Sequence, residues 1–199
     1  MARKKPQSKP HAITFSKPVI PVLWDNDIPD NLLQAADAVF LQGGAISDLA
    51  RILAPFETSA AKKIPLFLNI DLLAGLNSDE AALNYLTSAF PRITGIITTR
   101  HQLTNVAHRL GLAAIVRVFL QDSRALDRGI HIVKNNKPDA LELLPGIAAA
   151  HVASDFLSLD IPILGGGLIK TAQTVESIIN AGCSAVSTSK PDLWSLNLI

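Results

Sequence analysis

Eight apolar runs of strand length alternate with amphipathic stretches from Val19 onward, and this alternation constrains the fold more than any other feature of the sequence. Short apolar runs bounded by turn residues predict buried strands, and apolar residues at helical spacing predict helices. The predicted strands are residues 19–23, 38–44, 65–71, 95–99, 113–120, 140–144, 161–166 and 184–189. The predicted helices are residues 30–36, 47–56, 78–90, 101–111, 123–136, 148–159 and 171–182, and a short turn follows at 191–194.

Strands that alternate with helices build a parallel sheet of the α/β class, and eight such units predict a minimal (β/α)8 barrel of the TIM type. The strands are apolar along their whole length, as expected where a parallel sheet is buried on both faces. A doubly wound open sheet shows the same alternation, so periodicity leaves this alternative open. The length of 199 residues suits one domain, predicted at residues 18–199, after a basic, flexible arm at residues 1–17.

The predicted arm carries a charge asymmetry that the formal net charge of +1 conceals. Five basic residues and no acidic residue precede Pro18, namely Arg3, Lys4, Lys5, Lys9 and Lys17. The rest of the chain has 13 basic residues against 17 acidic ones, a net charge of −4. A basic arm on a mildly acidic body is typical both of nucleic-acid-binding proteins and of solvated tails.

Composition narrows the compartment in which the protein is expected. Hydrophobic residues make up 48% of the chain, which provides for a large core. No apolar run approaches the roughly 20 residues that cross a bilayer, so no membrane partner is expected. The single cysteine, Cys183, cannot form an internal disulfide, which favours a cytoplasmic location. The sequence is compatible with a homo-oligomer as well as with a monomer.

Three consecutive glycines interrupt the seventh predicted strand in "PILGGGLI" (162–169). Glycine weakens a strand, so three in succession indicate that something approaches the backbone closely. The loops after the seventh and eighth strands of a barrel frequently bind phosphate, which predicts a phosphate site with backbone N–H groups and hydroxyls as donors. The alternative is a glycine-rich turn that lets the seventh helix pack tightly. The residues of the predicted site are Gly165, Gly166, Gly167, Ser187, Thr188 and Ser189.

Four charged residues lie in or beside predicted strands, where a buried charge is costly unless it is paired. Asp71 ends the third strand and Arg100 follows the fourth, whereas Arg117 lies in the fifth strand and Glu142 in the sixth. All four are candidate ligand-binding residues. For Arg117 and Glu142, a mutual salt bridge between neighbouring strands is the alternative, and Asp71 has the alternative of capping the loop that follows it.

Other kinds of site find little support in the sequence. The five histidines show no metal-ligand spacing, so no metal site is predicted and they are interpreted as helix-surface residues. Cys183 has no histidine near it in sequence and is interpreted as a buried structural thiol. No lysine lies within a predicted strand, which disfavours Schiff-base chemistry, although Lys170 is placed to meet the phosphate. No catalytic residue is predicted.

Six strings, in order along the chain, resemble one known family. They are "IDLLAGLNSDEAALNYL" (70–86), "GIITTR" (95–100), "GLAAIVRVFLQDSRAL" (111–126), "PDALELLPG" (138–146), "PILGGGLI" (162–169) and "AGCSAVSTSKPDLW" (181–194). The sequence is similar here to the glycerol uptake operon antiterminator regulatory proteins, and the similarity runs from about Leu66 to Trp194. The first sixty or so residues match only loosely.

The resemblance implies a barrel fold and a cytoplasmic regulator that responds to glycerol 3-phosphate and binds leader mRNA, allowing transcription past a terminator. It implies glycerol 3-phosphate as a ligand and no cofactor. The positions shared with the family are Asp71, Gly75, Asp79, Glu80, Arg100, Arg117, Asp122, Glu142, Pro145, Gly146, Gly166, Gly167 and the run Ser187–Thr188–Ser189.

Two positions depart from the family pattern, and two other functions remain as alternatives. Asn69 stands where the family commonly has a histidine or another polar residue, and "IAAAH" follows Gly146 where the family often continues to a proline. The net charge of the body and its few aromatic residues do not themselves predict RNA contact, so the RNA partner rests on the resemblance.

The first alternative function is a barrel enzyme, an isomerase or lyase, that acts on a small phosphorylated metabolite. The second is a barrel that serves as an interaction scaffold.

Overall fold

Parallel strands close into a barrel in the computed structural model, which describes residues 13–24, 35–57 and 61–198. The barrel strands are β1 (Val19–Leu23), β2 (Val39–Leu41), β4 (Leu66–Asn69), β6 (Gly95–Thr98), β7 (Ala113–Phe119), β8 (Ala140–Leu144), β9 (Ile163–Gly166) and β10 (Ala185–Thr188). Their order around the barrel is β1, β10, β9, β8, β7, β6, β4 and β2, and β1 pairs with both β10 and β2. This closure confirms the predicted (β/α)8 barrel and rules out the open sheet.

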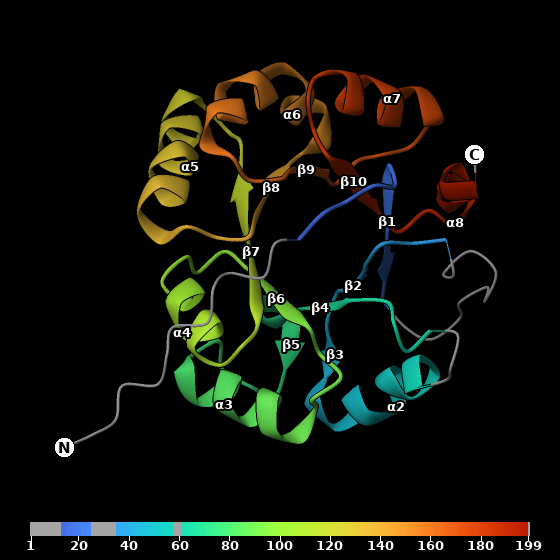
Figure 1. Ribbon diagram of the computed structural model, residues 1–199, viewed down its shortest axis with the longest axis vertical. Helices are drawn as coiled ribbons and strands as arrows, with labels where there is room; N and C mark the ends of the chain where they lie inside the picture. The colour runs from blue at the N-terminus through green and yellow to red at the C-terminus, as the bar shows by residue number, and fades with distance from the viewer. Residues whose placement is uncertain (1–12, 25–34, 58–60, 199) are drawn as a thin grey trace.

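The helices surround the barrel as an outer ring (Figure 1). They are α2 (Leu49–Leu53), α3 (Glu80–Ala89), α4 (Leu103–Arg109), α5 (Ser123–Asn136), α6 (Gly146–Val152), α7 (Ala172–Asn180) and α8 (Pro191–Trp194). The predicted bounds of α5 are confirmed, and the short turn predicted at 191–194 is the short helix α8. The prediction at 30–36 falls mainly on residues outside the described ones. None of the helices in the described ranges combines the length and the apolar character that a membrane crossing requires.

Two predicted helices are divided into an α-helix and 3-10 turns. The segment predicted at 47–56 consists of α2 between η1 (Ile46–Asp48) and η2 (Ala54–Glu57). The segment predicted at 148–159 consists of α6 followed by η4 (Ala153–Leu159). Tight 3-10 turns let short connections follow the curvature of the barrel between consecutive strands.

The second barrel strand is shorter than predicted because the chain turns away after Leu41. Gly43 and Gly44 have φ values of 117° and 102°, a conformation that suits glycine. The chain then forms β3 (Gly44–Ala45), which pairs in parallel with β5 (Leu73–Ala74). This small sheet was not predicted, and it lies beyond the carboxyl ends of β2 and β4.

Short polar side chains determine where several elements begin. The Oδ1 atom of Asn69 accepts a hydrogen bond from the Asp71 N–H at 3.1 Å and starts η3 (Ile70–Leu72), so β4 ends earlier than predicted. The Oγ1 atom of Thr171 accepts a hydrogen bond from the Thr174 N–H at 3.2 Å at the start of α7. Such caps satisfy N–H groups that have no partner within the helix.

The core has two layers, one inside the barrel and one between the strands and the helices. Inside, the rings of Phe40 and Phe67 meet edge to face with their centroids 5.7 Å apart. Ile13 and Phe15 pack against this inner layer, and Asp37 accepts hydrogen bonds from the Ser16 hydroxyl and the Lys17 N–H. Residues 13–17, placed in the flexible arm by the sequence analysis, are therefore in contact with the barrel.

The last described residues form hydrogen bonds to β1 and β10, the strands that close the barrel. The side chain of Asn197 accepts a hydrogen bond from the Val19 N–H at 3.0 Å and donates one to the Val19 carbonyl at 2.8 Å. Nearby, the indole N–H of Trp194 donates to the Thr188 carbonyl at 2.8 Å. Residues far apart in sequence thus hold β1 and β10 together.

Candidate functional site

A layer of polar side chains lies above the apolar layer inside the barrel. Residues two apart on a strand point to the same side, so the residue two positions after an inward apolar residue also points inward. Phe67 is followed in this way by Asn69, and Ile115 by Arg117. The same relation gives the remaining members of this layer, Gln42, Glu142, Gly166 and Ser187.

Hydrogen bonds join this layer across the barrel. The Arg117 Nε donates to Glu142 Oε2 at 2.6 Å, and the Ser187 hydroxyl donates to Glu142 Oε1 at 2.5 Å. The Gln42 Oε1 accepts from the Asn69 amide at 2.8 Å and from Arg117 at 3.5 Å. The Glu142 side chain is fully buried and that of Arg117 is 10% exposed, so the salt bridge considered in the sequence analysis is present. The two donors, one of them a cation, compensate the cost of burying the carboxylate.

A cavity of about 450 Å³ opens above this layer at the carboxyl ends of the strands. We call it the mouth cavity, and we call Gln42, Arg117, Glu142 and Ser187 its polar floor. Carboxyl strand ends form the functional face of TIM barrels. The other residues that line the mouth cavity are Val22, Trp24, Leu72, Phe119, Leu144, Gly167, Leu168, Ile169, Lys170, Thr188, Ser189 and Lys190.

The three consecutive glycines have three different surroundings. A Cβ on Gly165 would lie 2.8 Å from the Ile178 side chain of α7, so this glycine permits tight helix packing. A Cβ on Gly166 would lie 2.6 Å from Glu142 Oε1 and 2.7 Å from the Ser187 hydroxyl, so this glycine makes room for the polar floor. Gly167 has a φ of 74°. Among the three, Gly167 is the one that lines the mouth cavity.

Of the ten residues predicted for the site, six line the mouth cavity and four lie elsewhere. Those in the lining are Arg117, Glu142, Gly167, Ser187, Thr188 and Ser189. Asp71 instead accepts hydrogen bonds from the Thr98 hydroxyl at 2.7 Å and the Thr99 N–H at 2.6 Å. The Arg100 guanidinium donates to the Ser78 carbonyl at 2.7 Å. Asp71 and Arg100 therefore connect two neighbouring loops, while Gly165 and Gly166 lie behind the lining.

Sequence reasoning missed several residues of the mouth cavity. Gln42 follows the inward residue Phe40 by two positions, so strand periodicity alone would have found it. Lys190 directly follows the predicted Ser-Thr-Ser run, and it joins Lys170 in the lining. Trp24 and Phe119 carry no polar signal that marks a site, and only the closed barrel brings them to the cavity.

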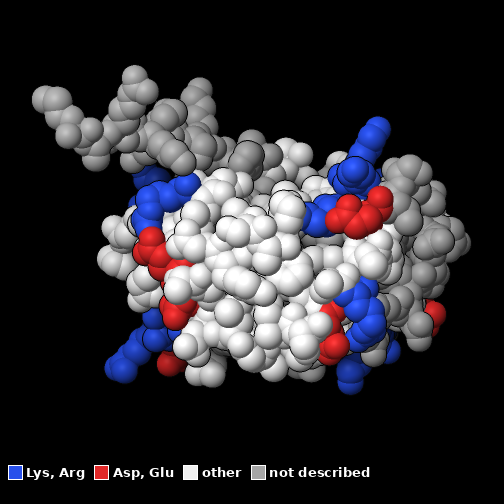
Figure 2. All heavy atoms as spheres, turned by 90° about the horizontal axis from the view of Figure 1, so that it is seen from below, with Lys and Arg blue, Asp and Glu red and all other residues white. Residues whose placement is uncertain are grey.

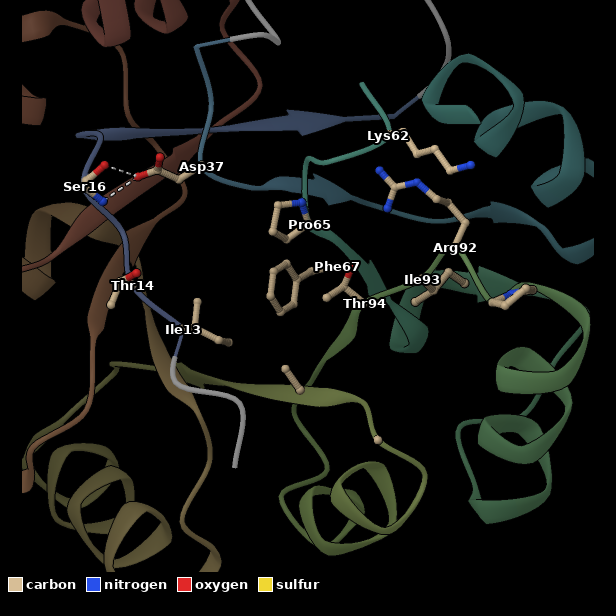
Figure 3. Close-up of a pocket in the computed structure, with 13 residues that line it drawn as sticks. Ile13, Thr14, Ser16, Asp37, Lys62, Pro65, Phe67, Arg92, Ile93 and Thr94 are labelled. Carbon is tan, nitrogen blue, oxygen red and sulfur yellow. Dashed lines mark hydrogen bonds between the residues drawn. The ribbon is translucent and has the colours of Figure 1, made fainter. Parts of the chain in front are cut away.

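A second cavity, of about 750 Å³, lies at the opposite end of the barrel (Figure 3). Arg92 lines this cavity, and its guanidinium donates hydrogen bonds to the carbonyls of Phe56, Ala61 and Ile64 at 2.7 to 3.1 Å. These bonds hold the connection that leads into β4. Burial lowers the pKa of Arg92, and the nearby Glu57 opposes this change. Because its guanidinium serves this connection, we assign Arg92 a structural role.

The remaining candidate groups also have structural surroundings. Cys183 is buried, and desolvation raises the pKa of its thiol to about 11, which agrees with the predicted structural thiol. His108, interpreted as a helix-surface residue, is half-buried with its Nε2 atom 2.8 Å from the Asp139 carboxylate. Within the described part of the chain, no three His, Cys, Asp or Glu side chains lie close enough together to hold a metal ion.

Several known proteins are similar to this chain. The crystal structure of the glycerol uptake operon antiterminator regulatory protein from Listeria monocytogenes is 28% identical, with a TM-score of 0.76 over 90% of this chain and 96% of that chain. A related protein from Thermotoga maritima is 31% identical, with a TM-score of 0.78 over 92% and 99%. The uncharacterized protein YgcP of Escherichia coli K12 is 29% identical over 130 residues, 65% of this chain and 68% of that protein.

Enzymes with the same architecture are more distant. The deoxyribose phosphate aldolase from Aeropyrum pernix is 14% identical, with a TM-score of 0.65 over 91% of this chain and 90% of that chain, which shows the barrel fold alone. The model of the glycerol-3-phosphate responsive antiterminators matches residues 19–194, almost the whole barrel. The chain therefore belongs to this family of glycerol uptake operon antiterminator regulators.

Proposed function

We propose that this protein binds glycerol 3-phosphate in the mouth cavity and that the bound ligand controls its binding to a leader mRNA. Binding to the leader would allow transcription to continue past a terminator into genes of glycerol uptake and metabolism. The observation that carries the proposal is that the mouth cavity has a polar floor without net charge on one side and two lysines, Lys170 and Lys190, on the other. This arrangement suits a small molecule with hydroxyl groups at one end and a phosphate at the other.

The phosphate is assigned to the side of the cavity formed by the loops after β9 and β10. Gly167 brings a backbone without a side chain to the cavity wall, and Ser189 adds a hydroxyl. Lys170 and Lys190 come from the same two loops. Backbone N–H groups, hydroxyls and ammonium groups are the usual donors to a phosphate, and barrels commonly place them after these two strands.

The glycerol hydroxyls are assigned to the polar floor. Arg117 and Glu142 form an ion pair with no net charge, so the floor offers donors and acceptors without favouring a second anionic group. Hydroxyl groups both donate and accept, and they can use the N–H groups of Arg117 and the free lone pairs on the Glu142 oxygens.

We infer a regulator that does not turn over its ligand. Glu142 is the one carboxylate among the described residues that line the mouth cavity, and it is held by Arg117 and Ser187. General acid–base chemistry needs a group that can gain or lose a proton near the operating pH. Both oxygens of Glu142 already accept a hydrogen bond, from Arg117 and from Ser187, so the carboxylate is placed to hold a ligand rather than to act on it.

Calorimetric titration tests the proposal with glycerol 3-phosphate, glycerol and inorganic phosphate. We expect one site, with glycerol bound at least about 10-fold more weakly than its phosphate ester because the charged contacts are lost. The Lys190→Ala variant should weaken glycerol 3-phosphate by about 10- to 150-fold, the usual value of a hydrogen bond to a charged group. Lys62→Ala, at the opposite end of the barrel, is the matched control and should bind normally.

Three results would contradict the proposal. Equal affinities for glycerol and glycerol 3-phosphate would remove the phosphate assignment. Consumption of glycerol 3-phosphate during prolonged incubation, followed by phosphorus and proton NMR, would replace the regulator with an enzyme. Binding of glycerol 3-phosphate without any binding of leader transcript in a mobility-shift assay would leave a metabolite-binding barrel without the regulatory role.

A further inference from the structure

Large apolar side chains gather on the rim of the mouth cavity. Eight of them are exposed in the described part of the chain, and four of these eight line this one cavity. They are Trp24, Leu72, Phe119 and Leu168, with exposed fractions of 60%, 48%, 51% and 72%. Single exposed apolar residues are common on proteins, but a group around a functional pocket indicates a contact surface. We call these four residues the apolar rim.

The members of the apolar rim come from different parts of the barrel. Trp24 follows β1, Leu72 lies in η3, Phe119 ends β7, and Leu168 follows β9. These positions are distributed around the ring of strands, so the rim surrounds the opening of the cavity. Leu168 has a φ of 58°, a left-handed conformation that is unfavourable for a leucine. An exposed leucine in such a conformation is typical of a residue kept for a contact.

Charge on the rim distinguishes among the possible partners. Lys170 and Lys190 are exposed beside the apolar rim, and the one acidic residue among the described lining residues, Glu142, is buried and neutralised by Arg117. A second copy of the protein facing this surface would bring four lysines together and would be repelled. A partner that combines negative charge with flat apolar groups satisfies both the lysines and the aromatic rings.

We infer that the apolar rim, with Lys170 and Lys190, is the surface that binds single-stranded RNA, an inference that rests on the proposed function. Unpaired bases stack on exposed aromatic side chains, here Trp24 and Phe119, while the lysines contact phosphates. Duplex RNA keeps its bases stacked inside and cannot use these rings. The flank that carries α2 and α3, by contrast, is uncharged over its centre and offers little attraction to phosphates (Figure 2).

The location of this surface explains how the ligand acts on RNA. Leu168 and Lys170 belong to the loop after β9, and Lys190 belongs to the loop after β10. These are the loops to which the proposed function assigns the phosphate. Glycerol 3-phosphate therefore orders residues of the RNA surface when it fills the cavity beneath them, which links the two binding events through shared loops.

The test uses the full chain and RNA ligands selected from a random single-stranded library in the presence of saturating glycerol 3-phosphate. Fluorescence anisotropy then measures the affinity of one selected RNA for the wild type and for the variants Trp24→Ala and Phe119→Ala. Loss of one stacked base should weaken binding by about 5- to 150-fold. The matched control is Tyr85→Ala, which removes an aromatic side chain that is 49% exposed on α3 and should bind RNA like the wild type.

Each outcome of this experiment decides one point. Calorimetry on every variant sets the concentration of glycerol 3-phosphate needed for saturation, so a change in ligand affinity is not mistaken for a change in RNA binding. Equal RNA affinity for all three variants and the wild type overturns the rim as the RNA surface but leaves the proposed function in place. If no RNA is selected although glycerol 3-phosphate binds, the RNA partner of the proposed function fails. Conversion of a dimer to a monomer by Trp24→Ala or Phe119→Ala in sedimentation, with RNA affinity unchanged, assigns the rim to a second copy instead.

Discussion

Glu142 illustrates how one residue can be understood only together with its immediate neighbours. Its carboxylate has no exposed surface, and it persists there because Arg117 and Ser187 donate to its two oxygens. Removing one partner of such a buried pair leaves an uncompensated charge and typically costs about 3–5 kcal/mol of stability. Gly166 is part of the same arrangement, because any side chain there would occupy the space of these oxygens.

At this scale we predict that two adjacent glycines differ in their effect on ligand binding although both matter for stability. Gly166→Ala should destabilise the fold by about 1–3 kcal/mol through overpacking and should also weaken glycerol 3-phosphate, because the new methyl group displaces Glu142. Gly165→Ala meets Ile178 on the helix side and should cost stability while leaving ligand affinity unchanged. Thermal unfolding and calorimetry measure the two quantities. Unchanged ligand affinity in both variants would show that the polar floor does not contact the ligand.

At the scale of elements, strands and helices were predictable because each carries a local signal. Continuous apolar runs marked the barrel strands, and the predicted bounds of β1 and β8 agree with the structure. What sequence could not supply was the partner of each loop residue. Asp71 and Arg100 look like site residues at strand ends, yet hydrogen bonds across two loops use both of them. Such contacts depend on how neighbouring connections lie, which periodicity does not encode.

The loop after β9 gives a prediction in which stability and function oppose each other. Leu168→Asn should raise the free energy of unfolding by about 1 kcal/mol, because asparagine tolerates the left-handed conformation better than leucine does. The same change removes an apolar contact and should weaken RNA binding. Chemical denaturation and anisotropy give both values. Leu198→Asn is the control for an exposed leucine outside the rim, and a comparable gain in stability there would refute the strain argument.

For the whole molecule, the central fact is that one end of the barrel concentrates the mouth cavity, two lysines and the apolar rim. The loops after β9 and β10 could be predicted as site loops from the glycines and the Ser-Thr-Ser run, because both are local patterns. Trp24 and Phe119 could not be identified in this way, because they come to the same cavity only when the barrel closes. The aromatic content of 5% gave no indication that two exposed aromatic side chains line one cavity.

Coupling between the two ligands is the prediction that belongs to the whole molecule. We expect glycerol 3-phosphate to tighten leader RNA binding by about 5- to 150-fold, a typical allosteric coupling. Thermodynamic linkage then requires RNA to tighten glycerol 3-phosphate by the same factor. Anisotropy titrations of RNA with and without the metabolite, and calorimetry of the metabolite with and without RNA, measure the two factors independently. Two unequal factors would reveal a further equilibrium, and factors of one would mean that the sites do not communicate.

The hydrogen bonds between Asn197 and Val19 have a consequence for how the protein is made. The two residues are separated by 178 positions, so β1 emerges from the ribosome long before the residue that completes its hydrogen bonding. At a synthesis rate of about 5–20 residues per second, this first strand waits roughly 10–35 s for its last neighbours. Throughout that interval, one edge of β1 stays without the strand that will cover it. In a protein whose sheets are completed by local hairpins, the corresponding strand edge is covered sooner after synthesis.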